Sequence, residues 1–224
     1  MKPIANYTPE QMEEIIEFIA KNYEGDGYIA HETESDYVHT DVYIAEDEEN
    51  GMRDFITFGM GAALMDVPID APLWVYERIE LAMHTSLNSD VTSREGSEVL
   101  SFLVNLSKYP FRNNTWFGPG HTVDVPKSFA DTFGYDFVLL EPTSLVFSPS
   151  DIAKDNDVDE VKFLEVIPIY ADEREWIVKN NSFIYLALLN IKFGNKMCLV
   201  DVKREHYIPS EEDLLLLEEW MKSN

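Results

Sequence analysis

Cysteine is almost absent from this sequence, which contains Cys198 and no other. A single thiol cannot close an intramolecular disulfide, so nothing in the chain requires an oxidising compartment. The N-terminus, MKPIANYTPEQMEE, lacks the apolar core of a secretion signal, and apolar runs such as Phe183–Leu189 are too short to span a bilayer. We therefore expect a cytoplasmic protein.

Basic residues are also scarce: 17 lysines and arginines stand against 42 acidic residues, a formal net charge of −25. Nucleic acids and anionic membranes are bound through clustered basic side chains, so neither is an expected partner. A strongly acidic surface favours solubility, and it can also attract a basic protein. The charge alone leaves both interpretations open.

The motifs of several enzyme classes are missing. The sequence has no Gly-x-x-x-x-Gly-Lys phosphate loop, no His-Glu-x-x-His metal motif and no Gly-x-Ser-x-Gly nucleophile elbow. Gly59-Met-Gly61 begins like a dinucleotide-binding loop, but Leu64 replaces the third glycine and Pro68 interrupts the helix that should follow.

An acidic segment, Asp155–Asp159, begins like a calcium-binding loop. Glu160 occupies the sixth position, where such a loop needs glycine for a sharp turn. Val166 occupies the twelfth, where it needs a bidentate glutamate. We therefore interpret the segment as a solvated acidic loop.

Potential metal ligands gather in one segment, which contains His31, Glu32, Glu34, Asp36, His39 and Asp41. On a strand, His39 and Asp41 would point to the same side, as two ligands of zinc or manganese can. Their spacing matches no known site, and loose clusters are common in a chain this acidic. We expect neither a bound metal nor an organic cofactor.

Two residues could act as catalytic groups if the fold activated them. Cys198 lies in a strand-like apolar run, Met197–Val200, which favours a buried, unreactive thiol. His121 follows Gly118-Pro-Gly120 and could be a general base, but the sequence ties no serine, cysteine or carboxylate to it. We favour a structural role, with the His121 ring hydrogen-bonded to a turn and packed on Trp116. An enzyme is not expected.

Two N-terminal helices are predicted from caps and apolar periodicity. The first covers 8–23, where Thr8 is the N-cap and Gln11 completes a capping box. The second covers Ser97–Tyr109, and Pro110 is expected to end it because proline has no N–H and clashes with the preceding turn.

The C-terminal third contains further helical patterns. Trp176–Phe193 is predicted to be helical but broken at Asn180-Asn181, because asparagine favours caps. A last helix over 210–222 is capped by Ser210, with Asp213 at the capping-box position. Its expected buried side consists of Leu214, Leu217, Trp220 and Met221.

Strands are predicted where β-branched and aromatic residues dominate or alternate with polar ones. Asn50-Gly51 favours positive φ, so the acidic run Glu46–Gly51 is interpreted as a hairpin loop. The predicted strands are Tyr37–Ala45, Asp54–Phe58, Leu73–Thr85, Phe137–Glu141, Val161–Ile169 and Met197–Val202.

Helices and strands are mixed without regular βαβ alternation, no Ser/Gly linker divides the chain, and no internal repeat is present. The sequence therefore predicts an α+β fold in which helices flank a mixed or mostly antiparallel sheet. We expect a single domain over residues 1–224.

The segment after the second predicted helix resembles a known family. Tyr109-Pro-Phe111 and Asn114-Thr-Trp-Phe-Gly-Pro-Gly-His-Thr-Val123 resemble the signature of the suppressor-of-fused domain. Weaker segments occur in the expected order between about 36 and 208, and together they are specific. They are Asp41–Tyr43, Ile56–Met60, Arg78–Leu81, Val138–Pro142, Val161–Pro168 and Leu199–Val202.

The resemblance implies a domain that acts by binding protein, with the helices 8–23 and 210–222 packed on it. Animal members resemble two-lobed scaffolds that clamp an extended peptide of zinc-finger transcription factors, and this chain is similar to their N-terminal lobe. Their binding tyrosine is matched by Tyr109, but Gly120 stands about where their aspartate is expected, which argues against the same mode of recognition. The partner-binding residues that the signature implies are Tyr109, Phe111, Asn114, Trp116, Phe117, Gly120 and His121.

Single-lobe bacterial members of this family include immunity proteins that neutralise toxins from neighbouring cells. Many toxin domains are basic nucleases, and complementary charge speeds their capture. The leading hypothesis is therefore a non-catalytic immunity protein whose partner is a basic toxin domain.

Two alternatives remain. One is a peptide-binding or chaperone-like module that adds a partner strand to an exposed sheet edge. An open edge strand beside Tyr109–His121 would favour it. The other is a hydrolase or metal-dependent enzyme centred on His121 or on His31–Asp41, which a deep pocket with converging histidine and carboxylates would favour.

Overall fold

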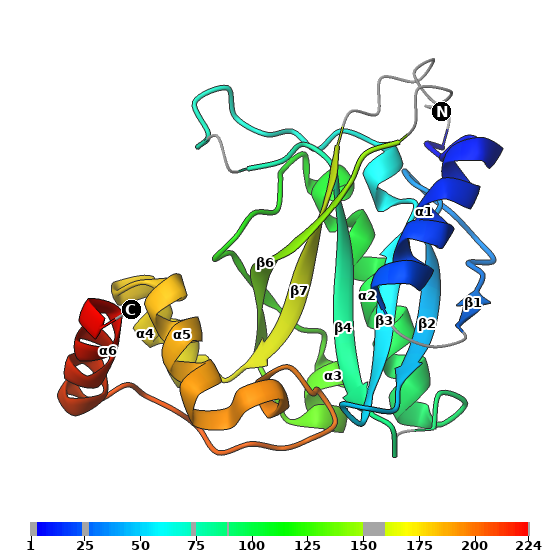
Figure 1. Cartoon of the computed structure of the whole chain (residues 1–224). Coiled ribbons are helices and arrows are strands. Elements are labelled where there is room, and N and C mark those ends of the chain that lie inside the picture. The colour runs from blue at the N-terminus through cyan, green and yellow to red at the C-terminus, as the bar shows by residue number, and fades with distance from the viewer. Residues whose placement is uncertain (1–3, 24–26, 73–74, 89, 150–159, 224) are drawn as a thin grey trace.

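The computed structural model describes residues 4–23, 27–72, 75–88, 90–149 and 160–223 of the chain. Its centre is one seven-stranded sheet with the order β1-β2-β3-β4-β7-β6-β5 (Figure 1). β4 and β7 are parallel, and the other neighbours are antiparallel. The strands are β1 (Tyr28–Ala30), β2 (Asp41–Asp47), β3 (Met52–Phe58), β4 (Ile79–Ser86), β5 (Thr122–Asp124), β6 (Phe137–Phe147) and β7 (Val161–Ile169).

Helices lie on both faces of this sheet, so the predicted α+β fold with a mixed sheet is confirmed. In Figure 1 α1 crosses the face toward the viewer, α2 lies behind the sheet, and α4, α5 and α6 gather beside β6. Within the described residues, no helix has the length and apolar composition needed to cross a membrane. The helices are α1 (Pro9–Asn22), α2 (Arg94–Asn113), α3 (Lys127–Phe133), α4 (Ala171–Lys179), α5 (Ser182–Phe193) and α6 (Glu211–Ser223), with short 3-10 helices η1 (Met60–Ala62) and η3 (Gly194–Met197).

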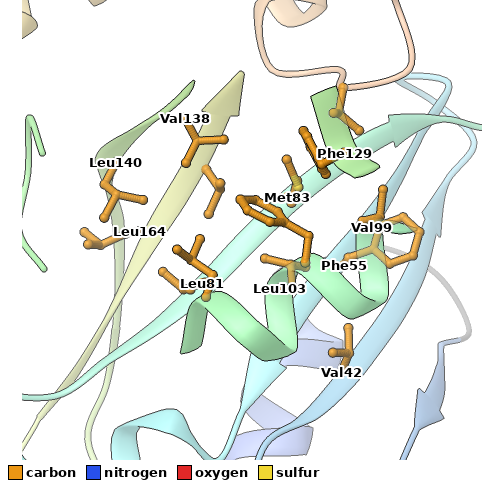
Figure 2. Close-up of a cluster of buried hydrophobic side chains, with 14 of the residues drawn as sticks. Val42, Phe55, Leu81, Met83, Val99, Leu103, Phe129, Val138, Leu140 and Leu164 are labelled. Carbon is orange, nitrogen blue, oxygen red and sulfur yellow. The ribbon is translucent and has the colours of Figure 1, made fainter. Parts of the chain in front are cut away.

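The largest core lies between the sheet and α2 (Figure 2). Val99 and Leu103 of α2 are fully buried against the sheet, and Leu81 and Met83 of β4 point toward them. Fully burying such a side chain is worth about 1.5–3 kcal/mol. The alternation that predicted one apolar face for this strand is therefore confirmed from Ile79 onward.

The first helix has the predicted N-terminus. The Thr8 side chain accepts a hydrogen bond from the Gln11 N–H, and the Gln11 side chain accepts one from the Thr8 N–H at 3.0 Å. Ile15 and Ile19 are fully buried on the face opposite α2. The capping box and the apolar stripe together fix where α1 starts and which side faces the sheet.

The predicted hairpin is also present, joining β2 to β3 in antiparallel register. Gly51 has φ +68°, and Asp47 accepts hydrogen bonds from the backbone and side chain of Asn50. β2 begins at Asp41 and not at Tyr37 as predicted, because Tyr37 has φ +66°, which is incompatible with a strand. The edge strand β1 was not predicted from the sequence.

Pro110 does not end the second helix, and this prediction was wrong. α2 runs from Arg94 to Asn113 with Pro110 inside its last turn. Proline removes only its own N–H, so the residues after it still donate to earlier carbonyls. The helix ends at Asn114, whose left-handed φ of +48° closes it and whose N–H donates to the Pro110 carbonyl.

Two strand predictions also need correction. The strand predicted over Leu73–Thr85 starts only at Ile79; residues 73 and 74 lie outside the described part. The strand predicted over Met197–Val202 is instead the end of a 3-10 helix followed by one bridge, between Leu199 and His84. β4 is already paired with β3 and β7, so a further segment can touch it only near its end.

The C-terminal helices agree with their predicted signals. The helical region breaks between α4 and α5, where the Asn181 side chain accepts a hydrogen bond from the Ile184 N–H. Ser210 and Asp213 exchange hydrogen bonds at the start of α6, and Leu217 is buried. The side chains of 220 and 221 lie outside the described ones, as does the calcium-like segment 155–159.

Glu80 ties the N-terminal part of the fold together. Its side chain is completely buried, and it accepts hydrogen bonds from the Tyr7 and Thr57 hydroxyls and from the N–H groups of Gly59 and Gly61. Burial raises the pKa of this carboxyl group, while these donors favour its ionised form.

The two glycines are required by this arrangement. Gly59 has φ +121°, and a Cβ there would lie 2.0 Å from the carbonyl oxygen of His39. A Cβ on Gly61 would lie 2.4 Å from the Tyr7 hydroxyl. The segment that begins like a dinucleotide loop is therefore a turn built around a buried carboxylate.

Glu80→Gln is expected to lower the free energy of unfolding by about 2 kcal/mol, because an amide places a donor where four donors converge on carboxylate oxygens. Urea denaturation followed by circular dichroism measures the loss. Glu77→Gln, three residues earlier and exposed, should stay within about 0.5 kcal/mol of the parent. Equal effects of the two substitutions would contradict this account of Glu80.

Candidate functional site

The signature loop follows directly from the end of α2. Tyr109 and Phe111 lie in the last turns of the helix and not in the loop, because α2 continues past Pro110. Tyr109 is 43% exposed, and its ring stacks on the buried Phe117 ring at a centroid distance of 5.6 Å. Phe111 packs partly buried against the main core, whereas Asn114 is exposed.

Trp116 and His121 face each other across the loop, with ring centroids 4.3 Å apart. Burial lowers the pKa of His121, and a hydrogen bond with the Trp116 backbone partly offsets this. Among the described residues, no carboxylate or nucleophile lies within hydrogen-bond distance of the His121 ring. The predicted packing of the His121 ring on Trp116 is confirmed.

Gly120 connects the loop to the sheet. It has φ +83°, its N–H donates to the Leu140 carbonyl at 2.8 Å, and a Cβ would lie 2.5 Å from the Ser182 hydroxyl. Both the backbone conformation and the neighbouring helix therefore favour glycine. No side chain is available at this position to contact a partner.

β5, which follows the loop, is an edge of the sheet. The His121 carbonyl accepts from the Leu140 N–H, and the Val125 N–H donates to the Asp136 carbonyl. Because backbone groups alternate in direction along a strand, those of Thr122 and Asp124 point away from β6. No other strand of the described chain pairs with that side.

A mostly apolar recess of about 420 Å³ lies beside the loop. Phe117, Gly118 and Pro119 form its loop wall, and β4 and β7 contribute Ile79 and Leu164. The other lining residues are Tyr76, Pro142, Lys162 and Phe183. Its size is within the range of protein ligand pockets, so the loop combines an open strand edge with a binding-sized recess.

The segment of potential metal ligands forms a network of polar contacts and lysine ion pairs. Asp41 lies 3.0 Å from His31 Nδ1 and 3.2 Å from His39 Nε2, while the Lys108 ammonium of α2 pairs with Glu32 and lies 3.3 Å from Asp36. The cation between these carboxylates is thus a lysine. Within the described residues, no group of histidine, cysteine and carboxylate side chains has a metal-binding arrangement.

This network lines a second recess, of about 590 Å³, between the segment 30–36 and α2. Its floor is apolar, with Val42, Leu100 and Val104, and its walls carry the paired charges of Lys108 and Arg112. The hydrogen bond from Arg112 lowers the pKa of Asp36. Lys108 and Arg112 are each paired with carboxylates of the segment 30–36, so neither cation is free to bind a ligand.

Comparison with known proteins identifies the family of this chain. A profile described as Suppressor of fused protein (SUFU) matches residues 36–205, more than half of the chain. This chain belongs to the suppressor-of-fused family. The match agrees with the signature read from the sequence, and known relatives in this family are protein-binding domains. No curated protein matches the sequence.

Solved structures share the fold of this suppressor-of-fused domain. The structure of the Sufu–Fu complex matches with a TM-score of 0.61 and 15% identity, over 96% of each chain. Drosophila Suppressor of Fused matches with a TM-score of 0.63 and 16% identity. The match includes 100% of this chain and 57% of the Drosophila chain. At these identities the likeness establishes the fold.

A buried histidine that no sequence motif marks lies on the other face of the sheet. His84 Nδ1 is 2.7 Å from Asp54, and its Nε2 is 3.7 Å from Glu165. Burial alone lowers the pKa of His84, but the hydrogen bond with Asp54 and the negative charge of the nearby Glu165 outweigh it and raise the pKa to about 9. Only the pairing of β3, β4 and β7 brings these residues together.

Cys198 is buried as predicted, and its thiol donates to the Asn195 carbonyl. Burial raises the pKa of this thiol to about 12, so it stays protonated at neutral pH. Neither Cys198 nor the buried His84 lines the recess beside the signature loop. The recess therefore contains no pairing of a nucleophile with a base.

Gly120→Ala should lower the free energy of unfolding by about 2 kcal/mol or more, because it adds left-handed backbone strain of about 1–2 kcal/mol to the contact with Ser182. Thermal or urea unfolding measures it. Gly51→Ala is the matched control: it also has positive φ, but its Cβ would meet nothing within 4 Å. A cost at Gly120 no greater than at Gly51 would show that the Ser182 contact is unimportant.

The interaction of His84 with Asp54 and Glu165 predicts that the stability of the protein depends on pH. Because its pKa is raised from 6.5 to about 9, its stabilisation is fully present below about pH 6.5 and is lost as the pH rises through about 9. The free energy of unfolding should fall by about 2–3 kcal/mol over this interval, at about 1.4 kcal/mol per pH unit.

His84→Asn retains a donor for Asp54 but cannot become charged, so it should remove this slope in urea denaturation at different pH values. His206→Asn, at an exposed histidine, is the control and should leave the slope unchanged. A parent protein whose stability is constant from pH 6.5 to 9 would contradict the assignment.

Proposed function

We propose that this suppressor-of-fused domain is a non-catalytic protein-binding domain that takes an extended segment of its partner along the open edge of β5. The observation that carries the proposal is that edge, where the backbone groups of Thr122 and Asp124 point away from the sheet. Unpaired groups on an edge strand can accept a partner strand without a change of fold. The Sufu–Fu complex supports a protein as the partner.

The signature residues surround this edge in ways that suit different roles. Tyr109 and Asn114 are exposed, and Trp116 and His121 are half-buried, so these side chains are available for contact. Aromatic side chains in such positions supply much of the energy of protein interfaces. Phe111, Phe117 and Gly120 are needed instead to hold the loop in place.

The charge of the chain supports a basic partner, and we propose a toxin domain that this protein neutralises as an immunity protein. A net charge of −25 would attract a basic nuclease domain and speed its capture. Binding should therefore weaken as salt is added. A general peptide-binding or chaperone-like module would use the same edge, but it would bind unrelated extended peptides with little dependence on their charge.

Asp124→Pro tests the edge, because proline removes the outward N–H of residue 124 and leaves the ladder to β6 intact. We expect binding to the product of the adjacent gene, as the candidate toxin, to weaken about tenfold, the value of one lost main-chain hydrogen bond. Isothermal titration calorimetry measures the affinity, and growth of cells that co-express the toxin measures protection.

Asp124→Ala is the matched control, since it removes the same carboxylate and retains the N–H. It should bind within about threefold of the parent. Equal affinities of the two variants would exclude strand addition at β5. A parent protein that neither binds nor protects against the neighbouring toxin would overturn the immunity function and leave protein binding to be tested with other partners.

A further inference from the structure

The recess beside the signature loop is built from rigid parts. Phe117 is buried under the stacked Tyr109 ring, and a Cβ on Gly118 would lie 2.5 Å from the Trp116 ring, so the loop wall is closely packed. The floor comes from β4 and β7, which pair in parallel at Ile79 and Lys162. Such a recess exists before any ligand arrives, which reduces the entropy lost on binding.

Phe183 lies at the boundary between the recess and solvent. It stands in the first turn of α5 and is 47% exposed, although it lines the apolar interior. A single exposed aromatic side chain is ordinary on a protein surface, but Phe183 also forms part of the wall of an apolar recess, where a ligand can reach it. An apolar group that entered would therefore gain contact with Phe183 as well as with the floor.

The charge of the recess is opposite to that of the chain. The chain carries 42 acidic residues, yet the lining contains no carboxylate and has one charged group, the ammonium of Lys162. Lys162 Nζ lies 4.7 Å from the centre of the Tyr76 ring. Among the described residues, no carboxylate lies within 4.0 Å of it, so this cation is held by an aromatic ring alone.

We propose that this recess binds the carboxyl-terminal residue of a partner polypeptide. An apolar or aromatic side chain would fill the pocket, and the terminal carboxylate would pair with Lys162. A volume of about 420 Å³ suits one large side chain with its own main-chain atoms and not a length of chain. If the side chain in the pocket is apolar, the only carboxylate that the same residue can carry is its main-chain carboxylate, which is present only at the end of a chain.

The acidity of the rest of the molecule does not prevent this pairing. At physiological salt the Debye length is about 8 Å, so carboxylates farther away are largely screened from the ligand. Lys162 is the charged group of the described lining, so it is the group that a ligand carboxylate in the recess would contact. The inference rests on the proposed function in one respect, that the partner is a protein.

The test uses two probes at about 0.15 M salt: the peptide N-acetyl-Gly-Gly-Phe with a free carboxyl group, and the same peptide as its amide. Heteronuclear NMR titration of the whole chain should show shifts at Gly118, Leu164 and Phe183. We expect the free acid to bind about tenfold more tightly than the amide, because it alone gains a charge-assisted hydrogen bond.

Lys162→Met should reduce this preference to less than about twofold while the amide still binds, because the apolar floor remains. Lys192→Met is the matched control: Lys192 also lies over a tyrosine ring, at 4.4 Å from Tyr207, but outside the recess. It should leave the preference unchanged.

Three results would overturn the inference: equal binding of acid and amide, no shift at the lining residues with either peptide, or a preference that survives Lys162→Met. Hydrocinnamate binding as tightly as the free-acid peptide would also overturn it, in favour of a small carboxylate ligand. None of these results depends on β5. A failed toxin assay with intact Lys162-dependent peptide binding would therefore reject the immunity function and keep the recess.

Discussion

A carboxylate with no exposed surface, that of Glu80, holds together the segments on which the sheet is built. Burying a charge costs free energy unless hydrogen bonds replace water, and here Tyr7, Thr57 and the N–H groups of Gly59 and Gly61 replace it. The N-terminal segment, the end of β3 and the following turn are thereby fixed to β4. The close approach leaves no space for side chains at the two glycines.

The position of β4 also determines the geometry of the candidate site. β4 pairs in parallel with β7, and this register places Ile79 beside Lys162 and Leu81 beside Leu164. The floor of the recess is thus part of the same sheet that Glu80 anchors. Its wall is the signature loop, whose exit into β5 is fixed by Gly120 between β6 and α5. A rigid core therefore presents a preformed surface made mostly of loop residues.

Electrostatic interactions act in this protein at two distances, over the whole surface and within the recess. The net charge of −25 acts over the whole surface and influences the approach of a partner. Contacts made after encounter depend on the groups that a ligand touches, and the described lining of the recess beside the signature loop is apolar with one lysine. Attraction at a distance and recognition at the site can thus have opposite signs, a distinction that composition alone does not show.

Local chemistry determined much of the fold from the sequence alone. The capping boxes of α1 and α6, the Asn50-Gly51 hairpin, the break before α5 and the alternation along β4 depend on neighbouring residues, and the signature loop identified the family. Tertiary structure decided what depends on distant residues. The last turn of α2 continues past Pro110, and the acidic segment receives Lys108 in place of a metal. His84 meets Asp54 and Glu165, and β5 becomes an edge beside a recess, only because chain segments far apart in sequence pack together, and a single sequence carries no local signal for such contacts.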